Sequence, residues 1–375
     1  MISKRGNGEG GIRQRNDGRW EARLTLAAGK RRSIIGRTRE EVATALATAL
    51  SDRNKGLPVA VDGKQTVRTY LDGWLAAIKG NVRPKTYAGY ESYIRVHVVP
   101  TLGSVRMARL TPQQVQGLYS KTLAAGLSPT TVRQIHACIH RAFQQAVRWG
   151  VVARNVADLV DRPRRAEHQM IALTPEQART LLDAAAGDRF EALYVLAVTT
   201  GMREGELLGL HWKDVDLDAA ALQVRTIVQR TKLTGLAFSE PKTAGSRRQI
   251  ALAGMAVAAL RRRRVIQAEE RLKLGPAWED NDLVFPNSLG KPTEATNLLH
   301  RSFKPLLEKA GLPPIRFHDL RHTAATIYLR KRVPAKVVSE MLGHSNIGIT
   351  LQVYSHVLPD MQREATAAME AALLG

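Results

Sequence analysis

The spacing of apolar residues changes along this 375-residue chain, and the change indicates a multidomain α+β fold. Up to about residue 57, apolar and polar residues alternate in three short stretches, 11–15, 19–26 and 31–35, and turn-forming residues separate them. Alternation with such turns is typical of antiparallel strands. A segment rich in Ala and Leu at helical spacing follows at 39–52. We therefore predict a small three-stranded sheet with one helix.

From about Thr66 the apolar residues recur at helical spacing instead, and we predict a helical bundle over residues 64–160. Its helices are expected at 67–79, 85–98, 112–124 and 129–149. The last is the best marked, because Ser128 can cap it and Pro129 suits its first turn.

Beyond about Met170 the pattern is mixed, and we predict a mainly helical domain with a small antiparallel sheet over 168–375. An apolar run at 193–198 predicts a buried helix that ends at Thr200 and Gly201. An Ala-rich amphipathic segment follows at 360–374. Its helix either completes its own domain or docks on a neighbouring protomer.

Basic residues outnumber acidic ones, 56 to 34, so the formal net charge is +22. This excess implies a polyanionic partner, either nucleic acid or an acidic membrane surface. Residues 1–57 hold 13 basic and 6 acidic side chains (net +7), residues 64–165 hold 16 and 4 (net +12), and residues 166–375 hold 27 and 23 (net +4). The concentration of charge in the first half favours binding of this polyanion there over a role in solubility alone.

Other sequence features indicate a cytoplasmic protein without a membrane partner. The single cysteine, Cys138, lies between Ile135 and Ile139 on a helical stripe and is expected to be buried. One cysteine fits a reducing compartment. The longest charge-free stretches fall short of the ~18 apolar residues of a membrane helix, and the first residues lack an apolar signal region.

Four candidate site residues, His318, Arg321, His344 and Tyr354, lie within one short part of the sequence. His318 and Arg321 are three positions apart, so on a helix they share a face and can donate to one phosphate. His344 follows in a Leu-Gly-His triplet, ten residues before Tyr354 (354 − 344 = 10). Cationic donors that converge on one phenol suit phosphoryl transfer through a covalent tyrosine. A His-x-x-Arg pair by itself is more often solvated surface charge.

Two upstream segments add further candidates. Arg203 comes just after the predicted helix end, with Glu206 three residues on, and the two form either a structural ion pair or part of an arginine clamp. Lys242 lies in a tight turn between strands predicted at 222–229 and 248–252. A lysine at a hairpin tip is usually solvated, but on a mobile hairpin it can protonate a leaving oxygen.

In their order and spacing these residues resemble the tyrosine recombinase family, the phage and mobile-element integrases. The family pattern is an arginine in a Thr-Gly-x-Arg-x-x-Glu-Leu block, a hairpin lysine, His-x-x-Arg, Leu-Gly-His and then a tyrosine. The matching residues here are Arg203 with Glu206, Lys242, His318, Arg321, His344 and Tyr354. The two arginines are 118 residues apart (321 − 203 = 118). The resemblance extends over essentially the whole chain.

The resemblance implies an enzyme that integrates and excises a phage or mobile element by cleaving and rejoining DNA strands. Tyr354 would be the nucleophile of a 3′-phosphotyrosyl intermediate, and Arg203 and Arg321 would bind the non-bridging phosphate oxygens. Lys242 would protonate the leaving 5′-oxygen. His318 would assist proton transfer at the nucleophile, His344 would bind the phosphate, and Glu206 would orient its neighbours. No metal, cofactor or ATP is expected.

The resemblance also implies three domains: an arm-type DNA-binding domain at 1–57, a helical core-binding (SAM-like) domain at 64–160 and a catalytic domain at 168–375. Expected partners are double-stranded DNA with core-type and arm-type attachment sites, other copies of the chain in a homotetramer, a DNA-bending host factor and an excision-directionality factor. The arginines expected to contact DNA are Arg13, Arg15, Arg19, Arg23, Arg31, Arg32, Arg133, Arg141, Arg164 and Arg165.

Several alternatives stay open on the sequence alone. The first domain is alternatively a small stabilising cap. The chain is alternatively a resolvase-like recombinase of dimeric replicons, or a DNA-binding protein without activity on a recombinase scaffold, which the intact residue set disfavours. His136 and His140 have the spacing of a helical metal pair but no third ligand, so we interpret them as phosphate-facing or solvated. Tyr328 is expected in the core.

Overall fold

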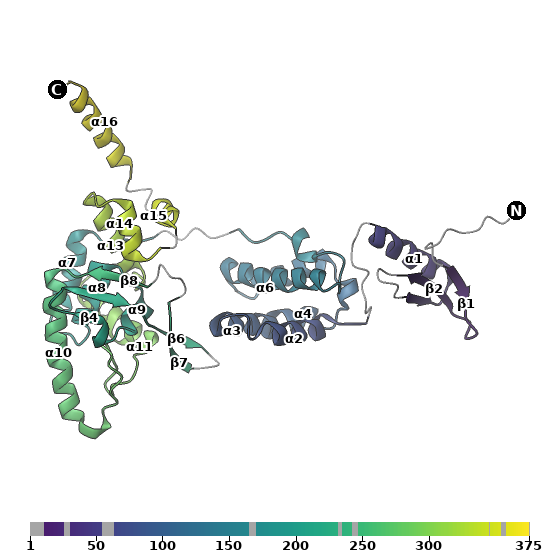
Figure 1. Ribbon diagram of the computed structural model, residues 1–375, viewed down its shortest axis with the longest axis horizontal. Helices are drawn as coiled ribbons and strands as arrows, with labels where there is room; N and C mark the ends of the chain where they lie inside the picture. Colours follow the sequence, from purple (N-terminus) through teal and green to yellow (C-terminus); the bar gives the residue numbers. More distant parts are fainter. Residues whose placement is uncertain are drawn as a thin grey trace. The chain divides into compact units, whose positions relative to one another are not determined.

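A computed structural model describes residues 11–25, 31–54, 64–164, 170–231, 235–241, 247–344, 346–353 and 358–374. The chain divides into two compact units, Met1–Glu167 and His168–Gly375 (Figure 1). Each unit has its own apolar cores, so each is described by itself.

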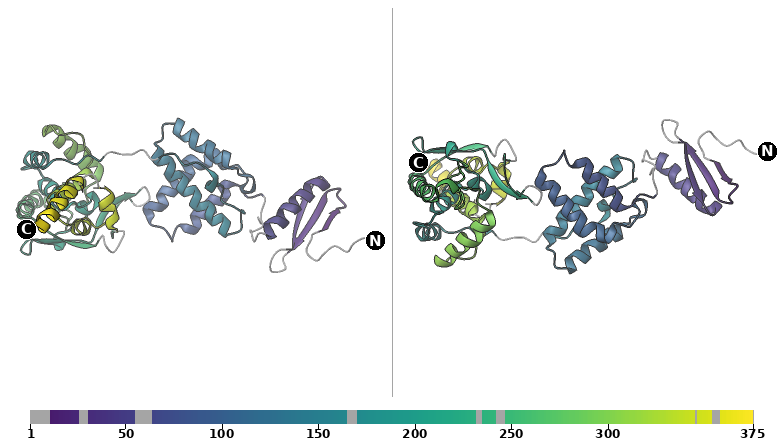
Figure 2. Two further views of the ribbon diagram at one scale, coloured as in Figure 1. Left: turned by 90° about the horizontal axis from the view of Figure 1, so that it is seen from above. Right: turned by 90° about the horizontal axis from the view of Figure 1, so that it is seen from below.

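The first unit opens with the predicted antiparallel sheet of β1 (Gly11–Gln14), β2 (Trp20–Thr25) and β3 (Arg31–Gly36) in the order β1-β2-β3. The backbone N–H of Arg15 donates to the carbonyl of Arg19 at 2.7 Å, which closes the first turn. Helix α1 (Arg39–Asn54) covers one face of the sheet, where Ala22 and Leu24 pack with Val42 (Figure 2). The alternation of apolar residues therefore predicted this sheet and its helix correctly.

A helical bundle follows, as predicted, with α2 (Val67–Ile78), α3 (Pro84–Tyr93), α5 (Pro112–Ala124) and α6 (Pro129–Arg148). The predicted helix at 85–98 continues from α3 through a π-helical turn (Ile94–Val98) into the short α4 (Val99–Leu102). Side chains of Thr66, Thr111 and Ser128 accept backbone N–H groups at the starts of α2, α5 and α6. Cys138 is fully buried in the core, as expected.

The second unit is mainly helical, with its strands grouped between α9 and α10. Before the strands come α7 (Pro175–Ala184), α8 (Glu191–Thr200) and α9 (Glu204–Leu208). After them come α10 (Gly254–Leu274), α11 (Ala295–Leu298), a π-helical turn (Leu299–Phe303), α12 (Lys304–Lys309), α13 (Asp319–Arg330), α14 (Ala335–Leu342), α15 (Ile347–Val353) and α16 (Leu358–Leu374). The core forms around α8, whose residues 192–198 are all buried and which packs against α10 and α13.

The strands correct one prediction. The strand expected at 222–229 is two strands, β5 (Ala221–Val224) and β6 (Ile227–Thr231), in different sheets. β5 lies between β4 (Val215–Asp216) and β8 (Arg248–Ala251), whereas β6 pairs with β7 (Gly235–Ser239). After β5 the chain leaves the β4-β5-β8 sheet, and β6 packs on α9. The approach is close, because a Cβ on Gly205 would lie 2.8 Å from the carbonyl oxygen of Val228. Lys242 therefore lies between β7 and β8, in a segment outside the described residues.

The last helix, α16, includes the amphipathic segment predicted at 360–374. Its described side chains from residue 366 onward are exposed, among them Met369 and Leu373 on the predicted apolar side. Whether this helix docks on its own domain or on a neighbour stays a prediction. Among the described residues there is no helix with the length and apolar character needed to span a bilayer.

Candidate active site

The site is built where α8 ends against α14. Helix α8 ends at Gly201, whose φ of +63° is a left-handed conformation that glycine adopts without steric cost. A Cβ at this position would lie 2.5 Å from Cδ2 of Leu342, so glycine also allows the close approach of α14. This contact brings Arg203, two residues later, beside the end of α14.

Arg203 and Glu206 form the predicted pair at the start of α9. The Arg203 guanidinium donates from Nη1 to Oε1 of Glu206 at 2.7 Å, and its backbone N–H donates to Oε2 at 3.0 Å. Glu206 is buried, whereas the Arg203 side chain is 37% exposed to solvent. The carboxylate therefore holds the arginine at the surface of the site.

A third member of this group, Arg248, was not among the sequence-predicted residues. It is the first residue of β8, and its side chain is 7% exposed. Nη2 donates to Oε2 of Glu206 at 2.9 Å, and Nε donates to the carbonyl of Met341 at 2.6 Å. A sequence signal existed, because Arg248 lies two positions before the buried Ile250 and so belongs to the inward face of the strand.

Burial would raise the pKa of the Glu206 carboxyl, but the hydrogen bonds and charge of Arg248, together with the charge of Arg203, lower it. Glu206 is therefore ionised at neutral pH. One buried carboxylate lies between two guanidinium groups, so the three side chains carry a net charge of +1.

Arg321 is buried on α13, with 3% exposure, and is not a solvated surface charge. Nη1 donates to the carbonyl of Gly201 at 2.8 Å, and Nη2 donates to the carbonyl of Leu342 at 2.7 Å. At the start of α13, Arg316 forms a bidentate ion pair with the buried Asp319, Nη2 to Oδ1 at 2.7 Å and Nε to Oδ2 at 3.2 Å. This pair fixes the turn on which His318 lies.

Three arginines from three segments thus donate to consecutive carbonyls of Met341, Leu342 and Gly343, which we call the α14 terminus. Arg248 binds the first, Arg321 the second and Arg203 the third, the last at 3.2 Å from Nη2. The last carbonyls of a helix lack intrahelical partners and form the negative end of its dipole, so guanidinium groups suit them. The next residue is His344, whose backbone N–H donates to Ser339 at 3.0 Å and whose Nδ1 is 2.7 Å from Oγ1 of Thr350.

The histidines of the site are neutral at pH 7. Burial and the charges of Arg321 and Arg203 lower the pKa of His344 to about 4. Burial, followed by the charge of Arg321, also lowers the pKa of His318, which retains an exposed edge. The ring of His322 meets that of His318 edge-on at 5.0 Å, and burial together with His318 lowers its pKa to about 4. Neutral imidazoles can accept a proton or a hydrogen bond.

The structure thus brings Arg203, Glu206, Arg321 and His344 together at the α14 terminus, with His318 at the start of the same helix as Arg321. Lys242 and Tyr354 lie outside the described residues. Their neighbours are described: Pro241, just before Lys242, is buried, and α15 ends at Val353, just before Tyr354. Tyr328 is structural, as expected, since its hydroxyl donates to the carbonyl of Thr199 at 2.5 Å.

The predicted DNA-binding arginines of the sheet are mostly exposed, but acidic residues accompany them. Arg13 and Arg23, 58% and 52% exposed, both contact the buried Glu21, at 2.7 and 3.4 Å. A hydrogen bond from Ser33 and another from Arg13 lower the pKa of Glu21 to about 2. At the turn tip, Arg15 and Arg19 both pair with Asp17. Only the backbone of Arg31 and Arg32 is described.

The predicted DNA-binding arginines of the bundle differ in their freedom. Arg133 is half-buried and donates to the carbonyl of Pro163 at 2.9 Å, so it fixes the chain that leaves the bundle. Arg141 lies over the ring of Tyr90, and Arg164 is exposed. Arg165 is outside the described residues.

His136 corrects a further prediction, because it is buried, with Nδ1 2.9 Å from the hydroxyl of Tyr119, and does not face phosphate or solvent. Its helix turns it inward with Val132 and Ile139. His140 remains half-exposed and pairs with Asp158 at 2.8 Å. Among the described residues, no group of three or more His, Cys, Asp or Glu side chains is arranged to hold a metal ion.

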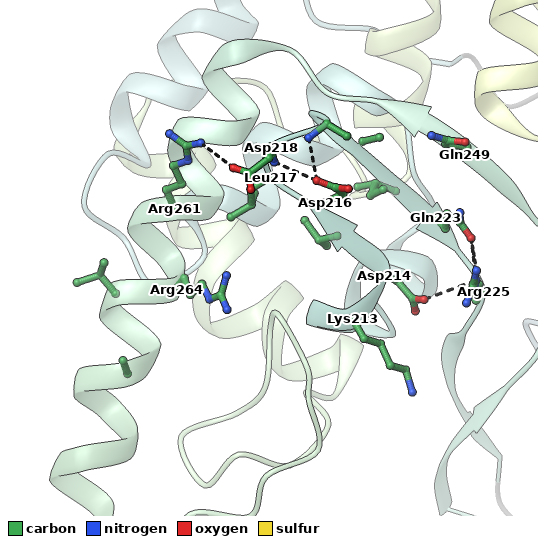
Figure 3. Close-up of a pocket in the computed structure, with 16 residues that line it drawn as sticks. Lys213, Asp214, Asp216, Leu217, Asp218, Gln223, Arg225, Gln249, Arg261 and Arg264 are labelled. Carbon is green, nitrogen blue, oxygen red and sulfur yellow. Dashed lines mark hydrogen bonds and ion pairs between the residues drawn. The ribbon is translucent and has the colours of Figure 1, made fainter.

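An open groove of about 1000 Å³, lined by no residue of the α14 terminus, lies between the β4-β5-β8 sheet and α10 (Figure 3). Basic and acidic side chains both occur along its lining, and two pairs are close: Arg261 lies 3.6 Å from Asp218, and Arg225 lies 3.6 Å from Asp214. The groove therefore presents no single cluster of like charge for a phosphate.

Two profiles of known families match the sequence. That of the phage integrase family matches residues 172–361, and that of the phage integrase N-terminal SAM-like domain matches residues 66–123. The first covers just over half of the chain. The chain belongs to the phage integrase family.

Individual relatives agree with this assignment. The chain is 32% identical to an integrase of Streptomyces ambofaciens over 94% of each sequence. It is 29% identical to a tyrosine recombinase XerC-like protein of Caldanaerobacter subterraneus subsp. tengcongensis, over 92% of this chain and 95% of the relative. The integrase of transposon Tn1549, solved with transposon right end DNA, shares its fold, with a TM-score of 0.70, 24% identity and coverage of 82% of this chain and 100% of that one.

The chain is therefore a tyrosine recombinase, an enzyme that breaks and rejoins DNA at specific sites. The family, the fold class and the activity predicted from the sequence are confirmed.

Proposed function

We propose that the chain is the integrase of a phage or integrative mobile element and that Tyr354 is its nucleophile. The observation that carries the proposal is the α14 terminus. Arg203 and Arg321 are 118 residues apart in sequence (321 − 203 = 118), yet they donate to the adjacent carbonyls of Gly343 and Leu342. His344 is the next residue of the chain. Two guanidinium groups and an imidazole beside one another suit a phosphate, because each can donate to its oxygens.

In this proposal the Tyr354 oxygen forms a bond to phosphorus while the bond from phosphorus to the 5′-oxygen breaks. The phenol, with a reference pKa of ~10, gives its proton to a base, and the neutral His318 can accept it. Lys242 gives a proton to the 5′-oxygen, which leaves as a hydroxyl. The phosphotyrosyl ester keeps the bond energy, so a 5′-hydroxyl of another strand can reverse the step without ATP.

Arg203 and Arg321 would stabilise the negative charge that develops on the non-bridging oxygens, and His344 would donate to the same phosphate. The carbonyl bonds of both arginines support this role, because they orient the guanidinium planes before substrate binds. Glu206 would orient Arg203 through its two contacts.

The domain roles follow the sequence prediction. Residues 1–57 would bind arm-type sites through the exposed Arg13, Arg19 and Arg23, the half-buried Arg15, and Arg31 and Arg32. Residues 64–160 would bind core-type sites through Arg133 and Arg141, with Arg164 and Arg165 in the linker. The enzyme would act as a homotetramer on double-stranded DNA in a bacterial cytoplasm, together with a DNA-bending host factor and an excision-directionality factor.

Covalent trapping tests this proposal. The protein is mixed in EDTA with nicked duplexes from its element and from candidate hosts, quenched in SDS, and the modified residue is located by mass spectrometry. We expect adducts at Tyr354 on one short sequence, none for Tyr354→Phe, and normal adducts for the matched control Tyr328→Phe. DNA binding without an adduct, or cleavage only with magnesium, would contradict the proposed chemistry. Joining of identical sites alone would favour a resolvase.

A further inference from the structure

Arg248 is the one guanidinium at the α14 terminus to which neither the sequence motifs nor the proposed chemistry assigns a role. Its side chain contacts two parts of the site at once. Its side chain donates to both carboxylate oxygens of Glu206, at 2.9 and 3.3 Å, and to the carbonyl of Met341 at 2.6 Å. Its backbone begins β8, directly after the segment that carries Lys242.

The charges around Glu206 suggest why a second arginine is needed there. If Glu206 paired with Arg203 alone, the two charges would cancel. A pair without net charge attracts a phosphate less strongly than a cation does. With Arg248 present, the carboxylate is shared, and Arg203 is the more exposed of the two guanidinium groups. The net charge of +1 is therefore carried on the side that solvent, and a DNA phosphate, can reach.

The position of Arg248 in the chain adds a second argument. Arg248 is the first residue of β8, and its side chain joins this strand to Glu206 and to the α14 terminus. The same terminus leads into His344 and, through α15, toward Tyr354. One side chain thus links Glu206, and with it Arg203, to the helix end that directly precedes His344.

We propose that Arg248 is a positioning residue for strand cleavage, which shares Glu206 so that the group keeps a net positive charge on the side of Arg203 and which holds Glu206 against the α14 terminus. This inference rests on the proposed function. It predicts a loss in the rate of cleavage with little change in DNA affinity, because Arg248 is buried and does not itself reach DNA.

The test compares five variants of the full-length chain: Arg248→Gln, Arg248→Lys, Glu206→Gln, the double variant Glu206→Gln with Arg248→Gln, and Arg263→Lys. For each we would measure the Kd for a core-site duplex, the single-turnover rate of adduct formation and the melting temperature. Arg263→Lys is the matched control, since Arg263 is equally buried and pairs with Glu270 at 3.0 Å, but in α10 and away from the site.

We expect Arg248→Gln to form the adduct on the order of 10²-fold more slowly, as for a small misplacement of reacting groups, at unchanged Kd. Arg248→Lys should recover part of the rate, because it restores the charge but not the bidentate contact. The double variant should be no slower than Arg248→Gln, since no carboxylate remains to neutralise Arg203. Arg263→Lys should have a lower melting temperature than the wild type but should cleave at the wild-type rate.

The results separate the two claims. Absence of any wild-type adduct would overturn the proposed function. If the wild-type chain forms the adduct and Arg248→Gln forms it at the same rate, the role of Arg248 alone is overturned. The same holds if Arg248→Gln weakens DNA binding, seen as a higher Kd, instead of slowing cleavage. It also holds if the rate reductions of Glu206→Gln and Arg248→Gln multiply in the double variant, because independent residues behave in that way. If Arg248→Gln does not fold, Arg248→Lys decides, because a wild-type rate in that variant contradicts the need for a bidentate contact.

Discussion

The α14 terminus and the N-terminal sheet use the same residue type in opposite ways. At the α14 terminus, Arg248 and Arg321 are 7% and 3% exposed and donate to backbone carbonyls and a buried carboxylate. On the sheet, Arg13 and Arg23 are more than half exposed and share Glu21. A buried guanidinium has fixed partners and therefore defines geometry, whereas an exposed one is screened by solvent and contributes mainly long-range attraction.

The largest effect is expected at Arg321. Its replacement by Ala leaves the carbonyls of Gly201 and Leu342 without these donors, at about 1–3 kcal/mol each. It also removes a proposed phosphate ligand, which typically costs on the order of 10²–10³ in rate. Urea unfolding and single-turnover cleavage, normalised to folded protein, measure the two losses. A cleavage rate within about tenfold of wild type would mean that Arg321 is structural only.

A second prediction isolates the contact between α8 and α14. Gly201→Ala places a Cβ 2.5 Å from Leu342 in addition to the strain of a positive φ. Gly187→Ala is the matched control, because Gly187 has φ +76° and nothing within 4 Å of its Cβ position. We expect a loss of about 1–2 kcal/mol for the control and a further ~1–3 kcal/mol for Gly201→Ala, both from urea unfolding. Equal losses would show that the helices adjust easily.

The pH dependence of stability should also differ between the two regions. The pKa of His344 falls from 6.5 to about 4 on folding, so the unfolded chain takes up its proton first and stability decreases as pH falls from about 6.5 to 4. The pKa of Glu21 falls from 4.5 to about 2, so its contribution is lost only below about pH 4.5. His344→Asn should weaken the first loss and leave the second, and Glu21→Gln should do the reverse. The free energy of unfolding of each variant, measured from pH 7 to pH 2, would show which part of the pH dependence is lost. If both variants changed the same pH range, the prediction would be wrong.

The smallest effect is expected for Arg13→Ala on the sheet. Arg13 is exposed and Arg23 also contacts Glu21, so the loss of stability should not exceed about 1 kcal/mol. If Arg13 contacts one arm-site phosphate, the salt dependence of binding should decrease by ~0.9 in log–log slope. Cleavage of a duplex that carries only the core site should stay at the wild-type rate. A reduced core-site rate would mean that the two regions are coupled in catalysis.

Local rules account for the parts of the fold that could be predicted. The strands of the first sheet follow from alternation and turns, and α6 follows from the Ser128 cap and an apolar stripe, because these features involve neighbouring residues. The separation of β5 from β6 was missed, since it depends on the close approach of Gly205 and Gly209 to β6 from an earlier part of the chain. His136 was misjudged for a similar reason, as its partner Tyr119 lies on another helix.

The sequence by itself determined the family, the order of the candidate residues and the helix on which Arg321 lies, because motif spacing and periodicity are properties of the chain alone. Only the tertiary structure decided that Arg321 is buried, that Arg248 shares Glu206 and that three guanidinium groups meet at the α14 terminus. Those contacts join residues that are 21 to 140 positions apart. No periodicity encodes such pairs, since they form only when helices and strands pack and buried charges must find partners.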